Sequence, residues 1–210
     1  MSQASQNVDL QVGELFNQAW RLFTENVGLL IGAALLFGVI LFVGNSFTYG
    51  LLGIVVTGPL ALGFAAIAMA IVRGGKPEFG VLFSGFQRFL PAFLANLLVT
   101  IFTAIGICLC IIPGLFVAMI YMLTYFYMYD KGLDFWESME ASRKTIMNNL
   151  GSWIVLALVL AGINIVGTIP CGIGLLVSGP LTALILALAY EKVEGAEDAA
   201  AMAGGADLGV

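Results

Sequence analysis

Hydrophobic residues occur in six long runs that polar and charged segments separate. The runs cover residues 27–43, 51–72, 91–112, 113–129, 152–169 and 171–190. A transmembrane helix needs about 20 apolar residues, within a range of about 17–25. The pattern therefore predicts six membrane-spanning helices. Residues 91–129 can be divided in more than one way: Pro113-Gly114 is the natural break, because proline cannot continue a helix from the preceding turn, and a re-entrant pair is the alternative.

Three polar segments, each ahead of a pair of runs, carry apolar residues at helical spacing. They cover residues 9–23, 78–90 and 133–147. Each is predicted to form an amphipathic helix at the cytoplasmic interface. We therefore expect an all-α integral membrane fold in which six transmembrane helices form three repeated hairpins, each preceded by such a helix. Short matches such as Gly58-Pro59-Leu60 with Gly179-Pro180-Leu181 support the repeat.

Composition and charge agree with this interpretation. The chain is 60% hydrophobic and 10% charged, with a mean hydropathy of +1.03, whereas a soluble domain averages about 45–50% apolar and about 25% charged residues. With six spans, every Lys and Arg falls on one side of the membrane. The positive-inside rule makes that side, and both termini, cytoplasmic. We expect one membrane domain over 9–192, between a disordered N-terminus (1–8) and a disordered Ala/Gly-rich tail (193–210).

Several classes of function have little support in the sequence. A net charge of −5 argues against a nucleic-acid partner, because phosphate binding requires a basic face. There is no His, which is the commonest general base and metal ligand. We find no nucleophile–base pair, metal cluster or nucleotide-binding loop, and so predict a non-enzymatic protein without cofactors; a lipid-acting membrane enzyme stays open.

Four short motifs resemble those of one protein family. They are Phe16 to Phe23 (FNQAWRLF), Phe83 to Phe89 (FSGFQRF), Ile112 to Leu115 (IPGL), and the segment from Gly179 to Tyr190. The chain is similar, over about residues 10–192, to uncharacterised bacterial six-span proteins that share the membrane domain fused to some glycerophosphoryl diester phosphodiesterases. The resemblance implies a bacterial inner (plasma) membrane location. The soluble phosphodiesterase domain is absent from this sequence, so its chemistry is not carried over.

Polar and helix-bending residues inside the spans are the candidate sites. Amides and hydroxyls in lipid need a partner, so they either join helices or line a solute pathway. Prolines free backbone carbonyls that can bind a ligand in a cavity, or only shape the helix. Small-xxx-small glycines let helices approach closely. The candidates are Asn96, Asn164, Thr100, Thr103, Pro59, Pro180, Gly28 and Gly32.

Three cysteines lie near the predicted non-cytoplasmic turns. In an oxidising compartment, Cys108 or Cys110 could form a disulfide with Cys171; the alternative is that all three are small apolar residues.

These observations lead to two hypotheses for function. The first is a non-enzymatic accessory or scaffold subunit, or a protein that organises the membrane, with lipid, other membrane subunits or its own copies as partners. The second is a channel or carrier for a small neutral or lipid-like solute. It is favoured if Asn96, Asn164, Thr100 and Thr103 face one continuous cavity.

Overall fold

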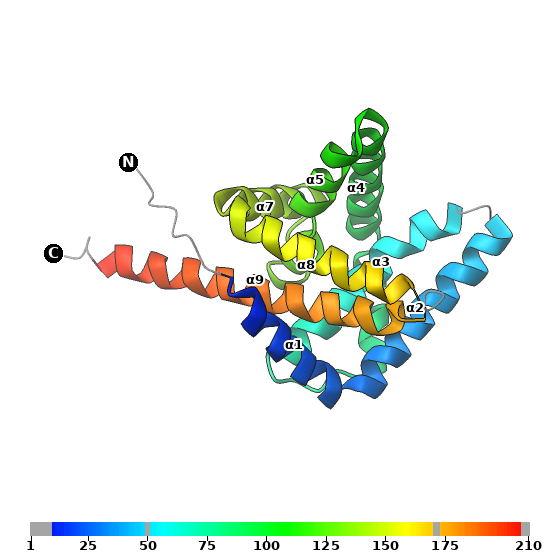
Figure 1. The fold of residues 1–210 in the computed structure, drawn as a ribbon, viewed down its shortest axis with the longest axis horizontal. Helices are drawn as coiled ribbons and strands as arrows, with labels where there is room; N and C mark the ends of the chain where they lie inside the picture. The colour runs from blue at the N-terminus through cyan, green and yellow to red at the C-terminus, as the bar shows by residue number, and fades with distance from the viewer. Residues whose placement is uncertain (1–9, 49–50, 170–172, 207–210) are drawn as a thin grey trace.

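Every secondary-structure element that the structure describes is a helix. The computed structural model describes residues 10–48, 51–169 and 173–206. The elements are α1 (Val12–Glu25), α2 (Val27–Thr48), α3 (Leu51–Val72), the 3-10 helix η1 (Phe79–Arg88), α4 (Phe89–Leu109), α5 (Ile111–Ile120), α6 (Thr124–Asp130), α7 (Phe135–Asn148), α8 (Leu150–Thr168) and α9 (Leu175–Ala206) (Figure 1). Five helical stretches are long and apolar enough to cross a membrane, and the bent pair α1–α2 makes a sixth if it is one span. The prediction of an all-helical membrane protein with about six apolar helices is confirmed at this level.

The ends of two elements differ from the predictions. The break between α4 and α5 lies at Cys110. Pro113 lies in the first turn of α5, where a backbone N–H has no acceptor within the helix, so proline is tolerated there. The α9 helix continues to Ala206, where the sequence predicted a disordered tail from residue 193. Residues 196–203 are rich in alanine, the strongest helix former, which accounts for the extension. Residues 1–8 lie outside the described residues.

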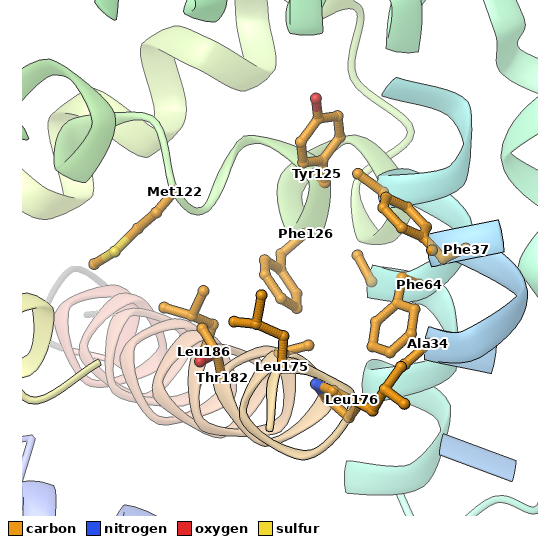
Figure 2. Close-up of a pocket in the computed structure, with 16 residues that line it drawn as sticks. Ala34, Phe37, Phe64, Met122, Tyr125, Phe126, Leu175, Leu176, Thr182 and Leu186 are labelled. Carbon is orange, nitrogen blue, oxygen red and sulfur yellow. The ribbon is translucent and has the colours of Figure 1, made fainter. Parts of the chain in front are cut away.

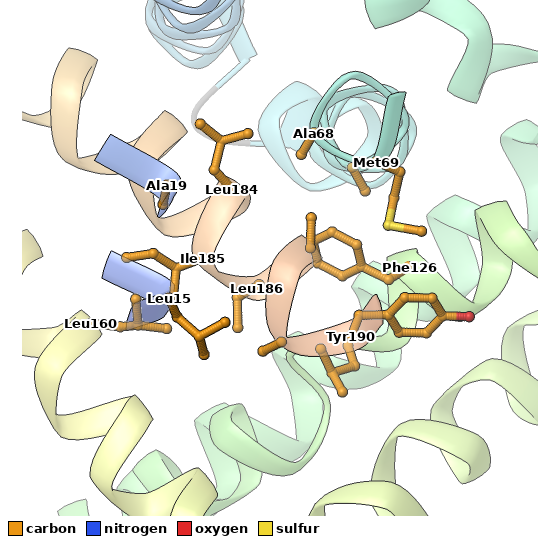
Figure 3. Packing of buried hydrophobic residues seen from close by; sticks show 14 of the residues in the cluster. Leu15, Ala19, Ala68, Met69, Phe126, Leu160, Leu184, Ile185, Leu186 and Tyr190 are labelled. Carbon is orange, nitrogen blue, oxygen red and sulfur yellow. The ribbon is translucent and has the colours of Figure 1, made fainter. Parts of the chain in front are cut away.

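The hydrophobic core surrounds α9. This helix packs against α1, α2, α3 and α8, and Figure 1 shows α1 and α8 lying along it. Figure 3 shows Ile185 facing Leu15 of α1, while Tyr190 lies beside Phe126. The Phe126 and Tyr190 rings stack with their centroids 6.1 Å apart. The apolar face of α1 is thus covered by α9.

Charged residues join the ends of α3 and α6 to the middle of α9. Arg73, directly after α3, donates to Glu191 of α9 (Nε–Oε1, 2.6 Å) and to Asp130 at the end of α6. Tyr190 Oη donates to the other oxygen of Asp130 at 2.8 Å. Removal from water opposes the charge of Arg73, but the hydrogen bonds with Asp130 and Glu191 outweigh this effect and raise the pKa of the guanidinium. Lys131 also pairs with Glu194.

The closest helix contact joins α3 to η1. A 3-10 helix has three residues per turn, so residues three apart share a face. The inner face of η1 carries Leu82 and Gly85, both buried. A Cβ built on Gly63 of α3 would lie 1.8 Å from Leu82 O, and one on Gly85 would lie 1.9 Å from Pro59 O. The two backbones therefore touch without intervening side chains.

A row of phenylalanines runs from the outer face of η1 onto the start of α4. Phe83, Phe86, Phe89 and Phe93 succeed one another with ring centroids 6.2, 6.4 and 6.0 Å apart. The sequence predicted an amphipathic helix over 78–90, with Phe79, Leu82, Phe83, Phe86 and Leu90 in one apolar stripe. The tighter winding instead separates them, because it turns Leu82 to α3 and leaves Phe83, Phe86 and Phe89 exposed.

Glycines also allow close backbone contact at the turns of two helix pairs. A Cβ on Gly106 of α4 would lie 2.7 Å from Gly114 Cα of α5, and one on Gly174 would lie 2.5 Å from Gly167 O of α8. Each pair of consecutive helices is therefore in backbone contact at its turn. The threefold repeat of the hairpins stays a prediction.

Arg88 holds the carboxyl end of α6. Its guanidinium donates to the carbonyl oxygens of Met128 (2.6 Å), Gly132 (2.9 Å) and Leu133 (3.0 Å). The last carbonyls of a helix have no intrahelical donor, so Arg88 supplies what the backbone lacks.

We expect Arg88→Met to lower the free energy of unfolding by about 2–3 kcal/mol, because hydrogen bonds from a charged donor contribute about 1.5–3 kcal/mol and three acceptors lose one partner. Arg88→Lys should restore less than half, because an ammonium cannot span three carbonyls as a planar guanidinium does. Thermal unfolding in detergent measures both variants. Equal stability of wild type and Arg88→Met would contradict this role.

Candidate functional site

An apolar cavity lies between α2, α3, α6 and α9. Its volume is about 560 Å³, within the range of about 300–1,000 Å³ typical of small-molecule sites. The cavity is partly open to the surroundings, and none of the described residues that line it is charged. Figure 2 shows Phe37, Phe64 and Phe126 around it. The lining residues are Ala34, Phe37, Gly38, Ala61, Phe64, Ala65, Met122, Tyr125, Phe126, Leu175, Leu176, Gly179, Pro180, Thr182, Ala183 and Leu186.

A broken span forms one wall of the cavity. The helix stops at Ile120 and restarts at Thr124, which places Met122 in the gap. Ser142 of α7 supports the break, because its Oγ donates to Ile120 O (2.8 Å) and accepts from Leu123 N (3.2 Å). Both ends of the break therefore have a hydrogen-bond partner, as buried backbone groups require.

The same helix α7 carries a buried polar face. Thr145 and Tyr127 share a hydrogen bond of 2.6 Å, and Ser138 and Ser142 are fully buried. A capping box between Asp134 and Glu137 begins this helix. The sequence predicted a weak apolar stripe here that included Trp136, and this side chain is 58% exposed.

The two intramembrane asparagines join helices. Asn96 Nδ2 donates to Ile54 O at 2.9 Å, and its Oδ1 accepts from Tyr125 Oη at 3.3 Å. Figure 2 shows the Tyr125 hydroxyl turned away from the cavity. Asn164 of α8 donates to Thr182 Oγ1 (2.8 Å) and accepts from Ser178 Oγ (3.1 Å), both on α9.

The four polar candidates do not share this cavity. Neither asparagine lines it, and nor does Thr100 or Thr103. Thr100 is exposed, and the hydroxyl of Thr103 is a buried atom without a partner in the described part of the chain. This arrangement does not favour a polar pathway through these residues.

The prolines and glycines have different surroundings. Pro180 lines the cavity, whereas Pro59 packs its carbonyl against Gly85. A Cβ on Gly28 would meet open space, while one on Gly32 would lie 3.0 Å from the ring of Phe79. The glycines in the closest contacts are therefore Gly63 and Gly85, which the sequence analysis did not select.

Cys108 and Cys110 are free and exposed. Cys171 lies outside the described residues, so the predicted disulfide stays a prediction.

Sequence reasoning did not find the cavity. Its aromatic lining comes from Phe37, Phe64 and Phe126, which look like any other apolar residue of a span. Of the residues that line the cavity, Gly179 and Pro180 were named from the sequence, as part of a repeated motif, and only Pro180 was a candidate site, through the helix bend that a proline produces.

Comparisons with known proteins give distant relatives. An uncharacterised protein of Mycobacterium tuberculosis (Rv2560) and one of Mycobacterium bovis (Mb2590) are each 28% identical to this chain over 126 residues. The match covers 60% of this chain and 39% of each relative, so the chain spans well under two thirds of their length. No family model and no solved structure matches the chain. The chain is thus a helical membrane protein similar to uncharacterised bacterial proteins.

Proposed function

We propose that this protein is a non-enzymatic, lipid-binding membrane protein that holds the apolar part of a lipid-like molecule between its helices and so organises or carries it. The observation that carries the proposal is the apolar cavity of about 560 Å³ between α2, α3, α6 and α9, with an uncharged lining among the described residues. A hydrocarbon chain from the bilayer is already out of water, so its binding depends on packing contacts with the cavity wall.

The polar residues of the spans fit a lipid ligand better than a hydrophilic solute. The side chains of Asn96 and Asn164 form hydrogen bonds with neighbouring helices. A hydrophilic solute would have to leave water without replacement partners, which costs free energy. The accessory-subunit hypothesis remains the second candidate. A cytoplasmic partner would meet the charged face of α7, where Arg143 and Lys144 both pair with Glu140.

The location we propose is the bacterial inner membrane, with both termini in the cytoplasm. Supporting this orientation, every Lys and Arg of a six-span arrangement falls on one side of the membrane, as the positive-inside rule predicts for the cytoplasmic side. The resemblance to six-span membrane domains agrees with it.

The free thiols test this orientation. In a Cys171→Ser background, a membrane-impermeant maleimide added to sealed right-side-out vesicles should label Cys108 and Cys110, because both are exposed at the α4–α5 turn. A cysteine placed by Lys76→Cys, between α3 and η1, should react only after permeabilisation. The reverse order of labelling would overturn the proposed orientation.

Native mass spectrometry of protein extracted gently from its own membrane tests the function. The proposal predicts one tightly retained lipid-like molecule that survives detergent exchange. Stoichiometric protein subunits without retained lipid would contradict the proposal and support the accessory-subunit hypothesis.

A further inference from the structure

Proline frees an acceptor in the cavity wall. Pro180 lies inside α9 and has no N–H, so the carbonyl of Leu176, one turn earlier, lacks its helical donor. Both Leu176 and Pro180 line the cavity. A proline ring lies against the carbonyl four residues before it. Because Leu176 and Pro180 both line the cavity, we expect the freed Leu176 oxygen on this side of α9.

A hydroxyl lies half a turn beyond this proline on the same helix. Thr182 lines the cavity, and its Oγ1 accepts a hydrogen bond of 2.8 Å from Asn164. A hydroxyl that accepts one bond keeps its own proton to donate. Asn164 is held in turn by Leu160 O at 2.8 Å and by Ser178, so the position of the Thr182 oxygen is fixed from outside the cavity.

A charged headgroup has no partner in this wall. The described lining is apolar except for Thr182, the backbone and the ring edge of Tyr125, whose hydroxyl is bonded to Asn96. An ion without a counter-charge or hydrogen bonds costs several kcal/mol to bury. A charged group is therefore disfavoured inside the cavity.

We infer that the cavity selects an uncharged lipid with a free hydroxyl group, which donates to Leu176 O and accepts from Thr182 Oγ1 while its hydrocarbon chain fills the space among Phe37, Phe64 and Phe126. This inference rests on the proposed function and names the ligand class of the same cavity.

The test compares ligands that differ in their polar group. Oleyl alcohol, its methyl ether, oleate and a phosphatidylcholine are titrated into the delipidated full-length protein, and the bound fraction is followed by native mass spectrometry. Oleyl alcohol should bind about 3–10-fold more tightly than the ether, because the ether loses the hydrogen bond to Leu176 O. Oleate should bind more weakly than the alcohol at a pH where it is ionised.

Single substitutions at Thr182 and Gly38 test where the ligand binds. Thr182→Val should weaken binding of oleyl alcohol by about 3–10-fold, and Thr182→Ser should restore it because the hydroxyl is kept. Gly38→Phe, which places a ring in the cavity, should weaken every ligand that occupies the site.

Each outcome has a distinct meaning. Equal affinity for the alcohol and the ether, or no response to Thr182→Val, would overturn the hydroxyl selection. If phosphatidylcholine binds best and Gly38→Phe still blocks it, the hydroxyl inference fails while the proposed function stands. If Gly38→Phe changes the binding of no ligand, the proposed function fails as well.

Discussion

Gly63→Ala and Gly85→Ala should each destabilise the protein by about 3 kcal/mol or more. A new methyl group at Gly63 would lie 1.8 Å from Leu82 O, and one at Gly85 would lie 1.9 Å from Pro59 O. These atoms belong to the backbone, so no rotation of a side chain relieves the overlap and α3 must move away from η1. Overpacking of a tight contact costs about 1–3 kcal/mol, and more where the backbone has to shift.

Gly80→Ala is the matched control, because Gly80 lies in the same 3-10 helix and a Cβ there meets open space. Thermal unfolding in detergent, followed by monodispersity on size-exclusion chromatography, compares the three variants. Gly80→Ala should match wild type within about 1 kcal/mol, the size of the Gly–Ala difference in helical propensity. Wild-type stability of both Gly63→Ala and Gly85→Ala would contradict the backbone contact between α3 and η1.

Gly38→Phe should reduce lipid retention about tenfold without loss of stability. Gly38 lines the cavity, and a Cβ at this position meets open space. A phenyl ring would displace two or three methylene groups of a bound chain. A bound chain comes from the bilayer or a detergent micelle, where it is already out of water, so the loss arises from overpacking of about 1–3 kcal/mol, which corresponds to about tenfold in affinity.

Gly162→Phe provides the matched control for this variant. Gly162 of α8 is also an exposed helical glycine with open space at its Cβ, but it does not line the cavity. The amount of co-purified lipid per protein, measured by lipid mass spectrometry, should fall for Gly38→Phe alone. An equal fall for both variants would assign the retained lipid to the general hydrophobic surface.

The sequence was sufficient to locate the apolar helices, because hydrocarbon thickness alone fixes their length. The run at 51–72 coincides with α3, and the run at 152–169 differs from α8 (Leu150–Thr168) by two residues or fewer at each end. The error at η1 has a definite origin. A helical period near 3.6 groups Leu82 with Phe83 and Phe86, whereas a period of three separates Leu82 from the two phenylalanines. The spacing of the phenylalanines at 83, 86 and 89, three residues apart, is the sequence feature that indicates a period of three.

The cavity and its supports depend on contacts between segments that are far apart in the chain. Arg88 reaches the end of α6 some 40 residues later, and Ser142 supports a break at residues 120–123. Neither residue has a sequence neighbour that identifies its partner. The apolar face of α1 shows the same limit, since an amphipathic pattern does not distinguish burial by lipid from burial by α9.

Photo-crosslinking tests the central claim most directly. A lipid with a diazirine in its acyl chain is incorporated into vesicles with the protein, and the labelled residues are mapped by mass spectrometry. We predict that label concentrates on the cavity residues Phe64, Leu176 and Leu186, and that unlabelled lipid competes it away. Label spread over outward-facing residues such as Leu109, Ile112 and Leu158, which are 67–79% exposed, with no label in the cavity and no competition, would contradict the account.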